Sequence, residues 1–288
     1  MKIIEPSVEY WQQGAGIEGV WNQIARATRV CYQSKPKEGE SGEDFVKRII
    51  LKPALIEGSL DNLEHCKFDF DKMHGAMLEH GTVYFTLKID ELTSLEFKII
   101  STLLHNPYSR LHANAVNGWY YITTNMRVIL ENNLVYALRY IDIPTDKHDK
   151  RYTFSVITDI GVTREMNRHR TFSIAEQSTR YCDFNKDKFG DDIMFIQPNW
   201  IGSDFANYEL IKSYIHAEFY YKALRKLGYR PEQARQVLPL GIKTQAVYTA
   251  FADDWKHFLR LRADNISGKA HPNIQLVAKK IQDIINTL

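Results

Sequence analysis

The chain has 288 residues, 44% hydrophobic and 12% aromatic, and is long enough to bury one large core or two small ones. Its 37 basic and 35 acidic residues leave a net charge of only +2, which argues against a protein that coats nucleic acid. Three cysteines are too few for a disulfide framework, and neither a membrane-spanning run nor a secretory leader is visible. We therefore expect a globular cytoplasmic protein with reduced thiols and no membrane partner.

The first third of the sequence is typical of helices. Apolar residues recur at helical spacing from Ile17 to Ile24, and Ser41, three residues before Asp44, has the pattern of a capping box. A further helix is expected at residues 96–104. Segments rich in β-branched and aromatic residues predict strands at residues 82–88, 119–123 and 152–157.

The remainder of the chain predicts mainly helices. A short helix is expected at 162–167, and a long one from Asp204, as its N-cap, to Lys226 before Gly228. The segments after it are a short helix that begins at Pro231, a strand at 247–251, a helix at 253–262 and a final amphipathic helix from 274 to 284. Together these elements predict an α+β fold, mixed helices with a central, mostly antiparallel sheet, in a single domain with an inserted element at about 89–150.

A polar segment at residues 167–181 carries the densest candidate functional groups. Arg168, Arg170 and Arg180 lie within thirteen residues, and guanidinium forks match phosphate oxygens that a hydroxyl such as Ser178 can also bind. If the segment is extended, Ser178 and Arg180 point the same way, whereas Arg168 and Arg170 share another patch. The segment then binds two anions. The alternative is a solvated helix end with an ordinary histidine at His169.

This segment resembles the signature of the flavin-dependent thymidylate synthases, enzymes that methylate dUMP to dTMP. The family pattern is Arg-His-Arg, seven residues, Ser, one residue, Arg, and residues 168–180 satisfy every fixed position. Ser173, Glu176 and Tyr181 agree as well, whereas Ala175 stands where the family often has Asn. Similar blocks occur at residues 231–240, 258–263, 78–80 and 27–31.

The resemblance implies which residues bind the ligands. The residues expected to contact FAD are Arg168, His169, Arg170, Glu176, His257 and Glu79. The residues expected to bind dUMP are Glu165, Glu176, Ser178, Thr179, Arg180, Arg235 and Arg262. Cys31 stands where a family serine often touches the flavin, and Phe251 stands where the family often has Asn.

Arg262 is the residue to which the resemblance assigns a catalytic role. A fork of donors from Arg262 to the O2 and N3 edge of uracil would stabilise the charge that develops on the polarised ring. The alternative is that Arg262 is a cation favoured by the dipole at a helix C-terminus.

The resemblance also implies the reaction and the assembly. NADPH reduces FAD, methylenetetrahydrofolate donates the carbon, and the reduced flavin supplies the hydride that completes the methyl group. A homotetramer with shared sites is expected, without nucleic acid. No glycine-rich dinucleotide fingerprint follows a predicted strand, so neither FAD nor NADPH is expected on a Rossmann crevice.

Three alternatives remain open at this stage. Cys182 could be a thiolate nucleophile whose pKa nearby arginines lower, although most lone cysteines are small core residues. The arginines, with Tyr181 and Phe184, could instead bind single-stranded nucleic acid. A zinc site is the third alternative, but no metal is expected because the spacing of its candidate ligands fits no common zinc pattern. Those ligands are His65, Cys66, His74 and His80.

Overall fold

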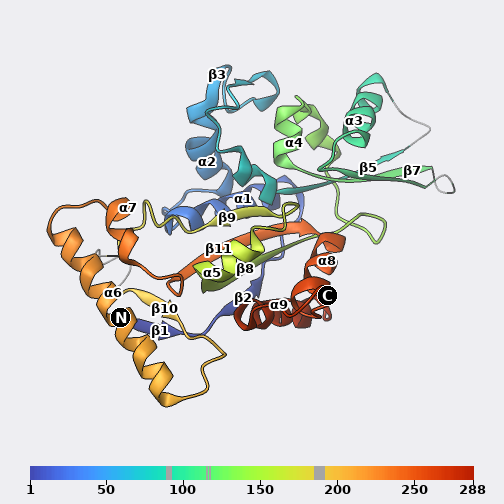
Figure 1. Ribbon diagram of the computed structural model, residues 1–288. Helices are drawn as coiled ribbons and strands as arrows, with labels where there is room; N and C mark the ends of the chain where they lie inside the picture. Colours follow the sequence, from blue (N-terminus) through green and yellow to red (C-terminus); the bar gives the residue numbers. More distant parts are fainter. Residues whose placement is uncertain (89–92, 115, 117, 185–191) are drawn as a thin grey trace.

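In the computed structural model, residues 1–88, 93–114, 116, 118–184 and 192–288 are described. Within these residues, the central sheet is antiparallel and has four strands in the order β2-β8-β11-β9 (Figure 1). The strands are β2 (Ser7–Tyr10), β8 (Arg151–Asp159), β11 (Lys243–Phe251) and β9 (Ser173–Glu176). The predicted α+β class and the antiparallel central sheet are confirmed.

The two faces of this sheet differ because side chains alternate along each strand. On one face, Phe154 and Tyr248 pack in a core with α8 (Ala252–Arg262) and α9 (Pro272–Ile285). On the other face, Val247 packs against the helix α1 (Gly16–Tyr32). The chain therefore encloses the sheet between helices on both sides.

A second sheet lies beyond α1, in the order β5-β7-β6 (Figure 1). Its strands are β5 (Thr82–Lys88), β7 (Trp119–Asn125) and β6 (Arg110–Asn114), which confirms the strands expected at 82–88 and 119–123. The largest core lies between this sheet, α1 and the helices α2 (Gly42–Val46), α3 (Ser94–Leu104) and α4 (Met126–Glu131). The capping box of α2 is present, with Asp44 N donating to Ser41 Oγ.

The expected insertion at 89–150 overlaps this second sheet. Strand β5 ends at Lys88, just before the expected boundary, and pairs with β7 along its whole length. Residues 89–92, 115 and 117 of the expected insertion lie outside the described residues.

The remaining elements form a third core at one edge of the molecule. The strand β1 (Lys2–Ile4) pairs in parallel with β10 (Met194–Ile196), and both pack on α6 (Asp204–Lys226), which runs along that edge (Figure 1). The short helix α7 (Pro231–Ala234) follows α6, and the strands β3 (Leu55–Glu57) and β4 (Lys67–Phe68) form a separate pair. In the described part of the chain, no helix is both long and apolar enough to cross a membrane.

Three predicted boundaries are wrong in detail. The N-cap of α6 is Ser203, whose Oγ accepts from Ala206 N, and Asp204 is the first helical residue. Strand β11 begins at Lys243 rather than at 247, because pairing with β8 and β9 extends it through polar positions that show no strand pattern. The helix expected at 162–167 is α5 (Ile160–Met166), which starts earlier because Asp159 Oδ1 accepts from Val162 N.

Candidate active site

The arginine-rich segment joins α5 to β9 and continues past the end of β9. Register pairing with β11 places Glu176, the last residue of β9, opposite Ala246. Immediately afterwards the backbone leaves the strand, and Ser178 N donates to the carbonyl oxygen of Cys31 in α1 at 2.9 Å. The segment is thus held between the central sheet and α1, which fixes the positions of its side chains.

A cavity of about 640 Å³ lies beside the end of β9. This volume is within the range of small-molecule sites. Four residues expected at the active site line it: Glu176, Ser178, Thr179 and Arg235. The other lining residues are Ile160, Thr163, Arg164, Gln177, Gln236, Leu238, Pro239, Leu240 and Ile242. We call the four, with the neighbouring Arg180, the cavity group.

Glu176 is held at the cavity wall by donors from neighbouring elements. Its Oε1 accepts from Thr163 Oγ1 of α5 at 2.8 Å and from Thr244 Oγ1 of β11 at 3.2 Å. Its Oε2 accepts from Asn167 Nδ2 at 3.4 Å. These bonds orient a carboxylate that can accept hydrogen bonds from a ligand.

The two arginines of the cavity group have exposed, weakly held side chains. Arg235 Nη1 donates to Thr179 Oγ1 at 2.8 Å, and Arg180 Nε pairs with Glu232 Oε2 at 3.0 Å. Solvent weakens interactions of exposed side chains, so an anionic ligand can compete for the guanidinium groups.

Residues 178–180 are not extended, so the arrangement considered for an extended segment does not apply to them. Cys182 N donates to the carbonyl oxygen of Ser178, and Arg180 N donates to Ser178 Oγ at 3.2 Å, so the segment turns here. Ser178 lines the cavity, and Arg180, which follows the lining residues in the chain, pairs with Glu232.

A second set of predicted residues meets between α5 and α8. Arg262 Nη1 pairs with Glu165 Oε2 at 3.0 Å, and Arg262 Nε lies 3.5 Å from His169 Nε2. The His169 ring lies 6.3 Å from that of His257 and stacks on Phe172. Glu165, His169, His257 and Arg262 are called the α8 group below.

His169 is a neutral group in this setting. The pKa of His169 is lowered to about 4. Burial is the main cause, and the positive charge of Arg262, with smaller effects of His257 and Arg168, contributes to the same shift. At neutral pH the imidazole therefore has one unprotonated nitrogen, which matches the position of its Nε2 opposite a guanidinium donor.

Arg168 and Arg170 follow α5 and are exposed. Among the residues that the structure describes, neither side chain has a hydrogen bond or ion pair. Their donors are available to a ligand or to a second chain.

Glu79 lies apart from both groups, in the 3-10 helix Gly75–His80. Its Oε1 accepts from Arg127 Nη1 at 2.7 Å. Arg127 and Cys31 both line another cavity, of about 310 Å³. Cys31 contacts both regions: it lines this cavity, and its backbone carbonyl oxygen accepts a hydrogen bond from Ser178 N of the cavity group.

Sequence reasoning missed several polar residues at the cavity, and Gln177 is one that connects it to a buried lysine. Gln177 lines the 640 Å³ cavity and accepts at its Oε1 from Lys243 Nζ at 2.8 Å. Burial lowers the pKa of Lys243 to about 8. Gln177 lies inside the recognised segment, but Lys243 lies in a stretch of β11 that has no motif, so only the fold reveals it.

The candidates for the alternative chemistries are placed elsewhere. Cys182 is only 1% exposed and is not among the residues that line the 640 Å³ cavity; its Sγ lies 3.9 Å from the carbonyl oxygen of Cys31. His80 is buried, with Nδ1 2.8 Å from Thr249 Oγ1. Across the described ranges, no three His, Cys, Asp or Glu residues are grouped in a way that could hold a metal ion.

Comparison with known proteins agrees with the resemblance seen in the sequence. The family model described as "Thymidylate synthase complementing protein" matches residues 149–288. The chain is 31% identical over 209 residues to the flavin-dependent thymidylate synthase of Thermosipho melanesiensis, which covers 66% of this chain and 88% of that protein. It is 32% identical over 166 residues to the flavin-dependent thymidylate synthase of Thermosipho africanus, covering 54% and 71%. The chain belongs to the flavin-dependent thymidylate synthase family of enzymes.

Proposed function

We propose that the protein methylates dUMP to dTMP, with methylenetetrahydrofolate as carbon donor and FAD, reduced by NADPH, as the source of reducing equivalents. Membership of the family supports this reaction. The observation that carries it is the cavity of about 640 Å³, whose lining joins hydroxyl and guanidinium donors to a fixed carboxylate. Such a lining suits a phosphorylated ligand with a polar ring.

The cavity group is proposed to bind dUMP. Ser178, Thr179, Arg180 and Arg235 supply donors for the phosphate, and their present partners are a hydroxyl and an exposed carboxylate. Glu176 accepts a hydrogen bond from the nucleotide. A phosphate offers several charged acceptor oxygens that match guanidinium forks, so rearrangement of both guanidinium groups toward it is favourable.

The α8 group is proposed to act on the pyrimidine. Arg262 directs donors at the O2 and N3 edge and stabilises the negative charge that develops there, while Glu165 and neutral His169 hold its guanidinium in place. Glu165 is also proposed to contact dUMP.

The residues that would hold FAD are Arg168, His169, Arg170, Glu176, His257 and Glu79. They fit this group because Arg168 and Arg170 have exposed donors without described partners, which suit a pyrophosphate. The neutral His169 ring offers an aromatic surface without adding charge. When bound, FAD supplies the redox chemistry of the reaction.

We propose a homotetramer in which different subunits complete one site. Within the described residues, no member of the α8 group lines the 640 Å³ cavity. The helix α6 also exposes large apolar side chains, which are typical of an interface: Phe205, Tyr208, Ile215, Phe219 and Tyr220. A second copy of the chain would cover them.

Residues 89–150 are proposed to be an insertion in the thymidylate synthase fold. The family match begins at residue 149, next to the C-terminal end proposed for this insertion. A variant in which a short linker replaces 89–150 should remain folded if the insertion is an accessory element, and unfolding of that variant would contradict this assignment.

The reaction is tested by following dTMP formation from dUMP with every component present and with each one omitted. We expect dTMP only when methylenetetrahydrofolate, FAD and NADPH are all supplied. Formation without flavin or without a reductant would contradict the proposal. Affinity for dUMP should vary little with salt, and oligonucleotides should not bind; steeply salt-dependent oligonucleotide binding would instead favour a nucleic-acid module.

Shared sites are tested by mixing Arg262→Ala, which has a low kcat, with Arg180→Ala, which binds dUMP weakly, after dissociation and reassembly. Activity is measured at a dUMP concentration that is too low to saturate Arg180→Ala, so that both variants are nearly inactive. If one site takes these residues from different subunits, mixed tetramers contain some sites with both native residues and regain activity. If both residues act within one chain, the mixture stays as inactive as its components.

A further inference from the structure

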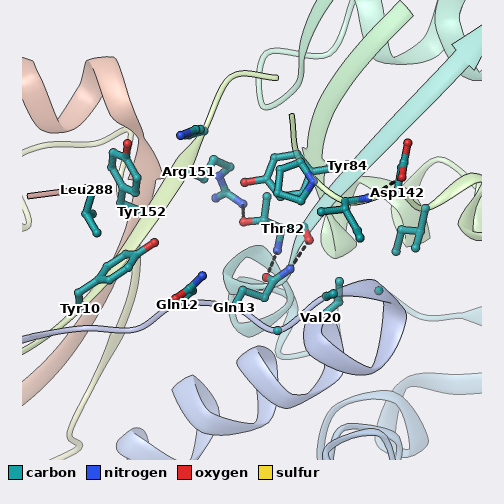
Figure 2. Close-up of a pocket in the computed structure, with 17 residues that line it drawn as sticks. Tyr10, Gln12, Gln13, Val20, Thr82, Tyr84, Asp142, Arg151, Tyr152 and Leu288 are labelled. Atoms are coloured by element: carbon teal, nitrogen blue, oxygen red, sulfur yellow. Dashed lines mark hydrogen bonds between the residues drawn. The ribbon is translucent and has the colours of Figure 1, made fainter. Parts of the chain in front are cut away.

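A second cavity, of about 400 Å³, lies where the central sheet meets the β5-β7-β6 sheet (Figure 2). Its walls come from β2, the loop before α1, β5, and the chain from Ile141 to Tyr152. It shares no lining residue with the 640 Å³ cavity. None of the residues proposed above to bind dUMP or FAD lines this cavity.

Arg151 is the central charged group of this cavity (Figure 2). It donates to the carbonyl oxygen of Glu79 at 3.0 Å, to Thr82 Oγ1 at 3.2 Å and to Ser173 Oγ at 3.4 Å. All these acceptors are uncharged. Its Nε is buried without a hydrogen-bond partner.

No carboxylate compensates the Arg151 charge at close range. Within the described chain it forms no ion pair, and Glu79 and Asp254 act on it only through longer-range attraction. Burial lowers the pKa of Arg151 to about 10, so it remains a cation at neutral pH. A largely buried cation without a counter-ion is unfavourable, and a bound anion would relieve that cost.

Lys150 supplies a second cation at the same cavity. Its side chain is exposed, and in the described residues it has no ion pair. In Figure 2, Asp142 lies on one side of Arg151 and Leu288 on the other, so a carboxylate lies at one side of the central cation. This arrangement favours a ligand with one anionic group over a ligand with anionic groups at both ends.

Tyrosine rings form the wall beside the cations. The rings of Tyr10 and Tyr152 meet edge to face, with centroids 6.1 Å apart. Burial raises the pKa of Tyr10, and the phenols of Tyr152 and Tyr84 raise it further. Such a wall offers flat apolar surface for a ring and hydroxyl groups at its edge.

Hydrogen bonds fix another part of the cavity wall, formed by the loop before α1 and by β5. The side-chain amide of Gln13 pairs with the backbone of Thr82 through two hydrogen bonds, of 2.7 and 2.8 Å, that tie the loop before α1 to β5 (Figure 2). A cavity that does not have to form on binding loses less free energy to ordering its side chains.

We propose that this cavity is a second ligand site, which binds a small organic anion with a planar ring, its oxyanion beside Arg151 and Lys150 and its ring against Tyr10 and Tyr152. The oxyanion is a carboxylate or a phosphate, since both have the charge and the acceptor geometry that the cations require. The site lies where the two sheets meet, so an occupant contacts both.

The proposal is tested by calorimetric titration of the full chain with benzoate and with phenyl phosphate, and with benzyl alcohol as the neutral match. We expect at least one anion to bind with a dissociation constant of about 1 mM or lower, and benzyl alcohol not to bind. The anion that binds more tightly identifies the head group. Absence of binding by both anions, or equal binding of benzyl alcohol, would overturn the proposal.

Variants locate the binding. Arg151→Gln and Lys150→Ala should each weaken binding of the anion about tenfold or more. Lys147→Ala, which removes an exposed lysine outside this cavity, should leave it unchanged. Because Lys150 is exposed, its variant tests the site even if Arg151→Gln fails to fold. Unchanged affinity in Lys150→Ala would contradict the site.

Failure of this proposal is separable from failure of the proposed methylation. Lys150→Ala should keep normal dUMP binding and dTMP formation, because no residue of this cavity lines the other. Conversely, if the unaltered protein forms dTMP but binds neither benzoate nor phenyl phosphate, only the proposal of a second ligand site fails.

Discussion

The cavity group and the α8 group both contain arginines, but different partners hold them. Arg180 and Arg235 are exposed and paired with Glu232 and with a threonine hydroxyl. Arg262 is partly buried between Glu165 and a histidine whose pKa burial has lowered to about 4. The first arrangement leaves cations free to re-pair with a phosphate, whereas the second fixes a cation in one orientation. The difference suits binding in one region and charge stabilisation in the other.

The largest effect is expected at the fixed cation. Arg262→Ala should lower kcat for dTMP formation by about 10²–10³-fold, because it removes donors aimed at developing charge. Arg260→Ala, an exposed arginine of the same helix, is the matched control and should be nearly neutral. Arg262→Lys keeps the charge at the helix end but loses the fork, so a lysine variant with full activity would show that Arg262 only stabilises α8.

The exposed cation Arg180 should affect dUMP binding rather than turnover. Arg180→Ala should weaken dUMP binding by about 10–100-fold, through loss of a charge-assisted hydrogen bond, with little change in kcat. Glu232→Gln, which removes its partner, should leave binding unchanged or tighter. An equal loss in both variants would mean that the pair itself maintains the structure.

A smaller effect is expected from the hydroxyl of the cavity group. Ser178→Ala should weaken dUMP binding by up to about tenfold, as for one neutral hydrogen bond. Equilibrium binding measured in parallel with Ser213→Ala, on the exposed surface of α6, separates this loss from a general effect. Wild-type affinity in Ser178→Ala would remove Ser178 from the site.

The α8 group should also make stability depend on pH. The folded-state pKa of His169, about 4, lies below its ordinary 6.5, so the unfolded chain binds more protons between these values. Stability should therefore fall as pH decreases from about 6.5 toward 4. His169→Gln should reduce that slope in urea unfolding, while buried His80, with a pKa near 3, retains part of it. An unchanged slope would contradict a buried neutral His169.

The smallest effect on turnover is expected at Cys182. Because its thiol is buried and absent from the cavity lining, Cys182→Ala should keep dTMP formation and lose about 1 kcal/mol of unfolding free energy. Loss of all turnover with FAD still bound would instead make Cys182 the nucleophile.

Much of the fold and of the site was accessible from the sequence. Periodicity located α1 and α9, cap and stop residues located α6, and the fixed spacing of the arginine segment identified the family. The start of β11 was missed because Lys243 to Gln245 become a strand only through pairing with β8 and β9. The turn at Ser178 was missed because a carbonyl oxygen from α1, distant in sequence, holds it. The burial of Lys243 and Arg151 depends on the tertiary fold, so no local sequence pattern predicts it.

The most direct test of the account is the visible absorbance of the purified protein, supplied with FAD and titrated with dUMP. The account predicts flavin bands that shift on addition of dUMP, and a shift that requires about 10–100-fold more dUMP in Arg180→Ala. A protein that takes up no FAD, or whose flavin bands are indifferent to dUMP, would contradict a shared site for flavin and nucleotide.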